Sequence, residues 1–295
     1  MTAPDAGPDP AVARAWALLE AGRPEQALDQ LARVPAALAE DPSVFAARAE
    51  ALVRTERWAE AATVARHGLA ATGPDPGLFA QLGLALCELG DHPSAEGAYL
   101  NGLREDPHDV QLLCRYAQLC LVANQVEKAT GLLGLAAEED PGHPMVYVVR
   151  IQAAWVRGGD RAAERTSREF LGAYPDIAVA RAMHGFTASV RGRTGTAFAS
   201  FRQAVAAEPT DPDYAEAARE ARIAAHPLLL PLRPVYRLGA IRTWLLAAGV
   251  IVGLRLLGQR EVAGIAGVVW LGYVVYSWLV PLLVRRLVPG RGPYR

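Results

Sequence analysis

Cysteine is scarce in this chain of 295 residues, and the few cysteines do not form a disulfide or metal pattern. Their number, three, is odd and there is no CxxC pair, which argues against a disulfide framework. We interpret Cys87, Cys114 and Cys120 as small buried apolar residues. The six histidines lack the spacing of metal ligands, so the sequence predicts no metal site; they are His67, His92, His108, His143, His184 and His226.

Catalytic fingerprints are missing as well. The chain contains no GxSxG, HExxH, P-loop or dinucleotide-binding motif. The acidic pairs Glu105-Asp106 and Glu138-Glu139 lie beside prolines, where we interpret them as solvated helix ends. We therefore predict that the protein is not an enzyme and has no cofactor. The N-terminus lacks the basic and apolar regions of a secretory signal, and residues 1–7 are predicted to be a short disordered leader.

Acidic residues almost disappear from the C-terminal part of the chain. Residues 228–295 contain nine arginines and a single acid, Glu261. Subtracting these from the 30 basic and 31 acidic residues of the whole chain leaves 21 and 30 in residues 1–227, a net charge of about −9. This acidic body argues against a nucleic-acid partner, because clustered Lys and Arg would be needed to neutralise phosphates.

Runs of β-branched residues are rare before residue 230, which predicts an all-α fold. Within this helical part a period of 34 residues is evident. Its small residue is Ala27, Ala61, Ala95, Ala129, Ala163 and Ala197. Prolines in the same period, where a second helix must stop, are Pro107, Pro141, Pro175 and Pro209. The intervening turn carries Gly22, Gly90, Asn124, Gly158 and Gly192.

This pattern resembles the tetratricopeptide-repeat family, and the third unit carries the resemblance most clearly. Its matching residues are Phe79, Leu82, Gly83, Leu86, Gly90, Ala95, Tyr99 and Pro107. The fifth unit departs from the pattern at Ile151 and Ser167. The resemblance implies a right-handed α-solenoid of six helix-turn-helix repeats, whose neighbours stack to bury a continuous core. The repeats would be 8–41, 42–75, 76–109, 110–143, 144–177 and 178–211, followed by a capping helix at 212–226.

The resemblance also implies a concave groove lined by the first helix of each repeat, at about its second, fifth, ninth, twelfth and thirteenth positions. The predicted partner-binding residues are Trp16, Leu84, Arg115, Gln118, Gln152, Trp155 and Phe186. Aromatic side chains would anchor a helix or an extended segment of a protein partner. The alternative, that many of these side chains are ordinary core between helices, stays open. The carboxylate clamp known from this family would need Lys at the fifth position. The sequence argues against such a clamp, because this position reads Val12, Ala46, Ala80, Cys114, Val148 and Ala182.

The C-terminal part has the composition of a membrane anchor. After a proline-rich linker at 227–237, the run Val262–Val284 has 23 residues without a charge, long enough at ~1.5 Å per residue to cross a core of ~30 Å. We predict a transmembrane helix at 262–284 and a second one at 238–257, where Arg242 and Arg255 could reach opposite interfaces. The alternative for residues 238–257 is an amphipathic helix lying in the interface.

Two further features concern the predicted hairpin. Gly249 and Gly253 form a GxxxG motif, which lets helix backbones touch; whether the hairpin pairs with a second copy stays open. The arginines flanking the hairpin outnumber the one in its loop, Arg260, so both termini are predicted to be cytoplasmic. The flanking arginines are Arg233, Arg237, Arg285, Arg286, Arg291 and Arg295, the last four in a basic tail at 285–295.

Taken together, the sequence predicts a membrane-anchored adaptor or scaffold whose partners are an unidentified protein and the lipid bilayer. The chain is similar to membrane-anchored tetratricopeptide-repeat proteins of bacteria. A composition rich in Ala and Arg and poor in Lys indicates a bacterium with a G+C-rich genome, and therefore the plasma (inner) membrane. The alternative function is an accessory subunit of a membrane complex for transport or envelope assembly, recognised through its transmembrane hairpin.

Overall fold

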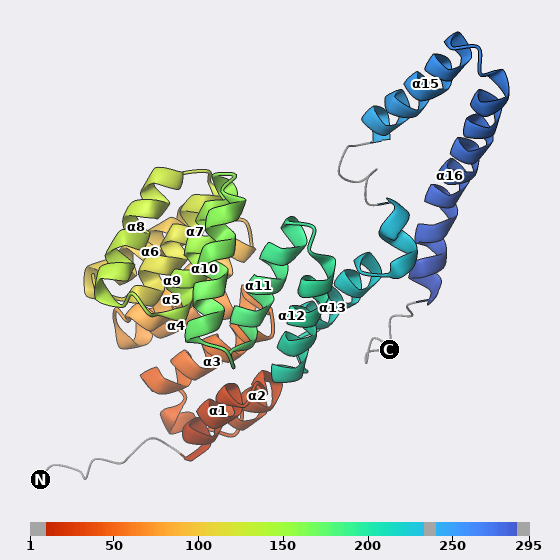
Figure 1. Ribbon diagram of the computed structural model, residues 1–295. Helices are drawn as coiled ribbons and strands as arrows, with labels where there is room; N and C mark the ends of the chain where they lie inside the picture. Colours follow the sequence, from red (N-terminus) through yellow and green to blue (C-terminus); the bar gives the residue numbers. More distant parts are fainter. Residues whose placement is uncertain (1–9, 233–239, 288–295) are drawn as a thin grey trace, which may run out of the picture. The chain divides into compact units, whose positions relative to one another are not determined.

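A computed structural model describes residues 10–232 and 240–287, and over these residues the chain is all-α, as predicted. The described part contains 15 α-helices, two short 3-10 helices and no strand. The chain divides into two compact units, Met1–Pro175 and Asp176–Arg295, and each is treated by itself below (Figure 1). The predicted leader at 1–7, residues 233–239 of the linker and first span, and residues 288–295 of the basic tail lie outside the described residues.

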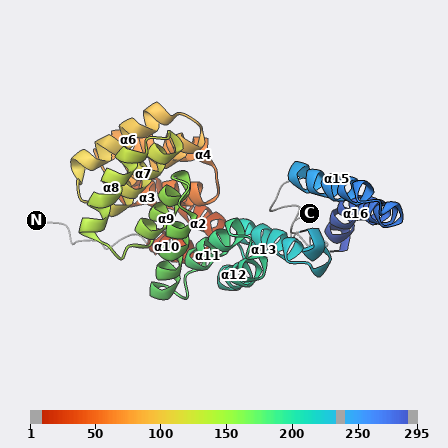
Figure 2. The same ribbon diagram turned by 45° about the horizontal axis from the view of Figure 1, so that its top comes forward.

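The first unit consists of five helix pairs. Each helix packs against the next, and the first helix of each pair also contacts the first helix of the following pair (Figures 1 and 2). The pairs are α1 (Pro10–Glu20) with α2 (Pro24–Leu31), α3 (Pro42–Arg54) with α4 (Trp58–Thr72), α5 (Pro76–Glu88) with α6 (His92–Glu105), α7 (Val110–Val122) with α8 (Val126–Glu139), and α9 (Pro144–Val156) with α10 (Asp160–Ala173). A single 3-10 turn, η1 (Ala36–Leu38), follows α2.

Aspartates set the starts of several first helices. The Asp41 carboxylate accepts a hydrogen bond from the Ser43 N–H at 2.9 Å, and Asp75 accepts one from the Leu78 N–H at 2.7 Å. Each of these caps satisfies an amide that the first turn leaves unpaired, and a proline follows the cap in both helices. Asp109 caps α7 in the same way. These helices therefore begin at the same point of the 34-residue period.

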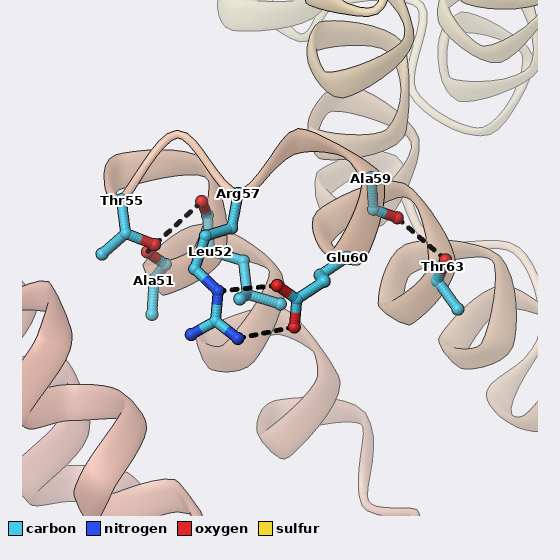
Figure 3. Close-up of polar contacts among 7 residues, drawn as sticks. All are labelled: Ala51, Leu52, Thr55, Arg57, Ala59, Glu60 and Thr63. Atoms are coloured by element: carbon cyan, nitrogen blue, oxygen red, sulfur yellow. Dashed lines mark hydrogen bonds and ion pairs between the residues drawn. The ribbon is translucent and has the colours of Figure 1, made fainter.

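The turn inside each pair requires a left-handed backbone. The four glycines of the period have φ between 68° and 80°, and Asn124 has φ 56°. The second pair places Glu56 at this point with φ 57°, a conformation that costs a residue with a Cβ. Hydrogen bonds brace the turn on both sides: the Thr55 hydroxyl donates to the Ala51 carbonyl at 3.0 Å, and Arg57 binds Glu60 with two bonds of 2.8 and 2.6 Å (Figure 3).

The core of each pair is a contact between small and large residues. The six alanines of the period are at most 1% exposed. Tyr99 of α6 is 1% exposed and its ring lies so close to Gly83 of α5 that a Cβ at residue 83 would overlap it. Small residues therefore let the two helices approach, and large side chains fill the remaining space.

The second unit contains one more helix pair, a following helix and an apolar hairpin. Its elements are α11 (Ala178–Val190), α12 (Thr194–Ala207), α13 (Pro212–Ala224), η2 (Pro227–Leu232), α15 (Ala240–Leu256) and α16 (Arg260–Leu287). A Cβ at Gly185 of α11 would lie 2.8 Å from the Phe201 ring of α12, so this pair uses the contact seen at Gly83. Helix α13 packs on α12 through Ala221 and Tyr214.

Helices α15 and α16 pack against each other and are joined by a tight turn at Gly258, where φ is 80° (Figure 1). One helix in the described part of the chain, at Arg260–Val284, is long and apolar enough to cross a membrane by length and composition. Helix α16 continues through Pro281 to Leu287. Helix α15 has 17 residues and is shorter than the predicted span at 238–257, the first two residues of which are not described.

Replacing Gly83 with alanine tests the helix contact. We expect Gly83→Ala to lower the free energy of unfolding by about 1–3 kcal/mol, because the added methyl group overlaps the buried Tyr99 ring. The matched control is Gly97→Ala in α6, where a Cβ meets nothing within 4 Å, and where alanine favours the helix by up to ~1 kcal/mol. Thermal unfolding measures both. Equal melting temperatures for the two variants would contradict the contact.

Replacing Glu56 with glycine tests the strained turn. We expect Glu56→Gly to raise the free energy of unfolding by about 1 kcal/mol, because glycine adopts a positive φ without a steric penalty. Asn124→Gly is the control, since asparagine already tolerates this conformation, and its effect should be smaller. Urea denaturation gives both values, and a loss of stability in Glu56→Gly would show that the side chain itself matters more than the backbone strain.

Candidate partner-binding surface

The first helices of the five pairs, α1, α3, α5, α7 and α9, lie side by side, and each presents the ninth residue of its repeat at the surface. Trp16 is 38% exposed, and the other four are half-buried. We call these five residues the A-helix face: Trp16, Glu50, Leu84, Gln118 and Gln152. Because the first helices share one register, residues 34 positions apart become neighbours on this surface.

Hydrogen bonds join neighbouring first helices along the A-helix face. The Gln118 side-chain N–H donates to the Gln152 carbonyl oxygen at 3.1 Å. The Glu50 carboxylate accepts a bond from Arg54 at 2.6 Å and a second one from the Gln81 side chain. Glu50, Gln118 and Gln152 are partly exposed, whereas Gln81 is buried.

The predicted lining positions differ strongly in exposure. At the fifth position Val12, Ala80 and Cys114 are buried, and at the twelfth position Leu19 and Val53 are buried. Burial raises the pKa of the Cys114 thiol to about 12, which leaves it protonated at neutral pH. At these residues the alternative noted above holds, since the side chains belong to the core between helices.

Two predicted site residues are half-buried and carry unpaired polar atoms. Within the described residues, the Trp155 indole nitrogen and the Arg115 Nε are buried and have no hydrogen-bond partner. Arg115 lies near Tyr99: burial raises the pKa of this tyrosine, and the positive charge of Arg115 opposes that rise. Each unpaired buried N–H costs free energy. Among the predicted site residues, Trp155 and Arg115 are the two that carry such an N–H.

Phe186, the ninth residue of α11, lies in the second unit. It is 38% exposed and stands edge-on to Phe201, with ring centroids 4.8 Å apart and an interplanar angle of 75°. The ring thus both supports the α11–α12 contact and presents an apolar edge at the surface.

The structure adds a pocket that sequence reasoning missed. It has a volume of about 390 Å³ and lies between α8 and the α9–α10 pair, lined among others by Thr130, Arg150 and Arg157. Arg157 donates to the Thr130 hydroxyl at 2.7 Å. Arg150 is the seventh residue of its repeat, which is not one of the groove positions of the family pattern. Arg150 and Arg157 are seven residues apart, which places them on one helix face. This spacing is the feature of the sequence that could have indicated the pocket.

Gly249 and Gly253, predicted to pack helix backbones together, lie away from the contact between α15 and α16. A Cβ at either residue would meet nothing within 4 Å. Helix α15 instead faces α16 around Trp244 and Ala248, beside Trp270. The glycine face of α15 is therefore open within the described chain.

Comparison with known proteins identifies the fold. No family model and no curated protein matches the sequence. Among solved structures, a thermophilic tetratricopeptide-repeat (TPR) protein of Thermus thermophilus matches with a TM-score of 0.56 and 18% identity, over 61% of this chain and 98% of that one. The chain has the TPR fold. A TPR protein of Parabacteroides merdae matches with a TM-score of 0.52 and 14% identity, over 72% and 85% of the two chains.

A third match belongs to a protein assembly. The APC/C hetero-tetramer Cut9-Hcn1 matches with a TM-score of 0.57 and 13% identity, over 74% of this chain and 43% of that one. Identities this low establish the fold alone. The fold stacks its repeats so that the first helices of successive repeats lie side by side, as α1, α3, α5, α7 and α9 do here.

The two glutamines of the A-helix face are suited to mutation without unfolding the protein. We expect Gln118→Ala and Gln152→Ala each to lower the free energy of unfolding by about 1 kcal/mol or less, because their shared hydrogen bond is partly exposed. Urea denaturation measures the change. A loss of several kcal/mol in either variant would mean that these side chains belong to the core rather than to a binding surface.

Proposed function

We propose that this protein is a membrane-anchored adaptor: six TPR repeats at 8–211 bind a protein partner on the A-helix face, and a C-terminal hairpin places them at the membrane. The observation that carries the proposal is the row of half-exposed side chains on five adjacent first helices. Such a row fits one helix or one extended segment of a partner better than a compact small molecule.

The chemistry of the A-helix face suits an amphipathic segment. Trp16 and Leu84 offer apolar contacts, and Trp155 near the end of α9 adds a large ring. Gln118 and Gln152 can fix the orientation of a bound segment through hydrogen bonds. Protein interfaces usually combine a few large anchoring side chains with polar contacts between them.

The membrane anchor rests on the surface of α16. Its apolar side chains are exposed in several directions, with Val268 at 71% and Trp278 at 76%. In water such a surface is unfavourable by roughly 25 cal/mol per Å², whereas lipid accepts it. We propose that α16 spans the plasma membrane and that α15 is a second span, with the stems of Arg242 and Arg255 extending toward opposite interfaces.

The arginine distribution assigns the orientation in this proposal. With more arginines flanking the hairpin than in its loop, both termini and the repeats face the cytoplasm. No enzymatic step is proposed, and the anchor acts by confining the partner to the membrane surface, which raises its local concentration.

A second candidate function uses the hairpin for recognition. The open face of α15 at Gly249 and Gly253 has room for another helix backbone within van der Waals distance. The protein would then be an accessory subunit of a membrane complex, or would pair with a second copy of itself. In either case the hairpin, and not the repeats, would carry the recognition.

Site-specific photocrosslinking tests the proposal. A photoreactive amino acid at Gln118, on the A-helix face, should crosslink one defined protein partner in intact membranes. The matched control places the same group at Leu135, which is exposed on the partner helix α8 of the same pair. Crosslinks should form from residue 118 and not from residue 135, because only the first helix faces the bound segment.

Trp155→Ala adds a second readout to the same experiment. We expect this variant to reduce the crosslink from residue 118 several-fold while the protein still fractionates with membranes, because the indole contacts the partner and not the hairpin. Equal crosslinking from residue 118 in the wild-type chain and in Trp155→Ala would argue against partner binding on the A-helix face. Crosslinks that arise only from positions on α15 would favour the second candidate function.

A further inference from the structure

The segment η2 packs along the C-terminal half of α16. Leu229 and Leu232 are buried against Val280 and Val284 of that helix. Ile223, at the end of α13, packs against the same cluster. The helix that follows the last repeat is therefore connected to the proposed membrane span by a packed segment, and not only by the chain itself.

Two tyrosines of α16 bind the backbone of η2. The Tyr276 hydroxyl donates to the Leu228 carbonyl at 2.6 Å, and the Tyr273 hydroxyl donates to the Pro231 carbonyl at 2.7 Å. The tyrosines are three residues apart, and so are the carbonyls. One face of α16 thus meets one face of the 3-10 helix, in which residues three apart are aligned.

Within η2, a proline leaves the Leu228 carbonyl without its usual donor. In a 3-10 helix the carbonyl of a residue accepts the N–H of the residue three positions later. For Leu228 that residue is Pro231. Proline has no N–H, so the Tyr276 hydroxyl supplies the hydrogen bond that Pro231 withholds, and Tyr273 binds the carbonyl of Pro231 itself.

Two backbone N–H groups at the start of η2 are bound by His226. The N–H of Leu228 donates to the His226 ring at 3.3 Å, and that of Leu229 donates to the His226 carbonyl at 2.9 Å. Every side chain from Pro227 to Leu232 is apolar. Non-helical backbone is tolerated next to hydrocarbon only when its polar groups are satisfied by protein, and the tyrosine bonds meet that condition.

Two leucines of η2 are exposed within the described chain. Leu228 is 42% exposed and Leu230 is 47% exposed, whereas Leu229 and Leu232 are buried against α16. The depth of these side chains follows from the part of α16 that η2 contacts. Tyr273 and Tyr276 lie in the middle of the proposed span at 262–284, and Val280 and Val284 lie toward its C-terminal end, so η2 follows the C-terminal half of the span.

We infer that Pro227–Leu232 is a lipid-contacting strap, held on α16 by Tyr273 and Tyr276, with Leu228 and Leu230 against the acyl chains of the cytoplasmic leaflet. This inference rests on the proposed membrane span. The strap holds α13 at the membrane surface through Ile223.

Spin labels at single cysteines test the strap in the full chain, reconstituted in vesicles of phosphatidylethanolamine and phosphatidylglycerol. The native cysteines are replaced by alanine, and a label is placed at Leu230, at Leu279 of α16, or at Glu220 of α13. Residues 279 and 220 are exposed in the structure, so they provide the lipid and water references. Collision rates with oxygen and with a water-soluble nickel complex report the environment of each label.

We expect the labels at 230 and 279 to collide mainly with oxygen and the label at 220 mainly with the nickel complex. A label at 279 in lipid with a label at 230 in water would overturn the strap and leave the membrane span intact. Labels at 279 and 230 both in water would overturn the span and the strap together. The three labels therefore distinguish failure of the inference from failure of the proposed function.

The tyrosine hydroxyls provide the second variant. We expect the double change Tyr273→Phe and Tyr276→Phe to shift the label at 230 toward nickel accessibility and leave the label at 279 in lipid, because it removes two bonds and keeps both rings. Tyr147→Phe is the matched control. The ring of Tyr147 stacks on Phe170 and lies in the first unit, so this variant should change neither label. An unchanged label at 230 in the double variant would show that the tyrosines do not hold the strap.

Discussion

The contact between a small residue on one helix and a ring on its partner is the constraint on which the rest of this structure depends. Gly83 lies against the ring of Tyr99, and Gly185 lies against the ring of Phe201. The alanines of the 34-residue period are buried in every pair. Close packing within a pair lets neighbouring pairs stack, and the first helices of the first unit lie side by side.

Register follows from the ends of the helices. Aspartate caps start several first helices at the same point of the period, and left-handed turns end them at the same point. The ninth residues of successive repeats are therefore aligned, which creates the A-helix face. Glu56 shows how strongly the packing imposes this turn, since the surrounding pair holds a residue with a Cβ in a conformation that usually favours glycine.

The two parts of the chain differ in the surfaces that they expose. The acidic repeats bury their apolar side chains between helices and leave charges outside, whereas α15 and α16 expose apolar side chains on most of their surface. Between them, η2 is apolar but not α-helical, and Pro231 deprives the Leu228 carbonyl of its donor within the segment. Tyrosine hydroxyls from α16 bind the Leu228 and Pro231 carbonyls, so protein groups satisfy these two acceptors.

The sequence by itself determined the features that depend on residue type at a fixed spacing. The all-α class, the glycine and asparagine turns and the long charge-free run near the C-terminus all follow from short-range preferences repeated along the chain. The turn at Glu56 does not, because glutamate carries no local signal for a positive φ. Only the tertiary structure decided which lining positions are buried, since that depends on how each helix is rotated against its neighbours, and Cys114 is core while Gln118 reaches the surface. Only the tertiary structure brought Tyr273 and Tyr276 to η2, because those bonds join residues 42 and 48 positions apart, and no periodic pattern relates them.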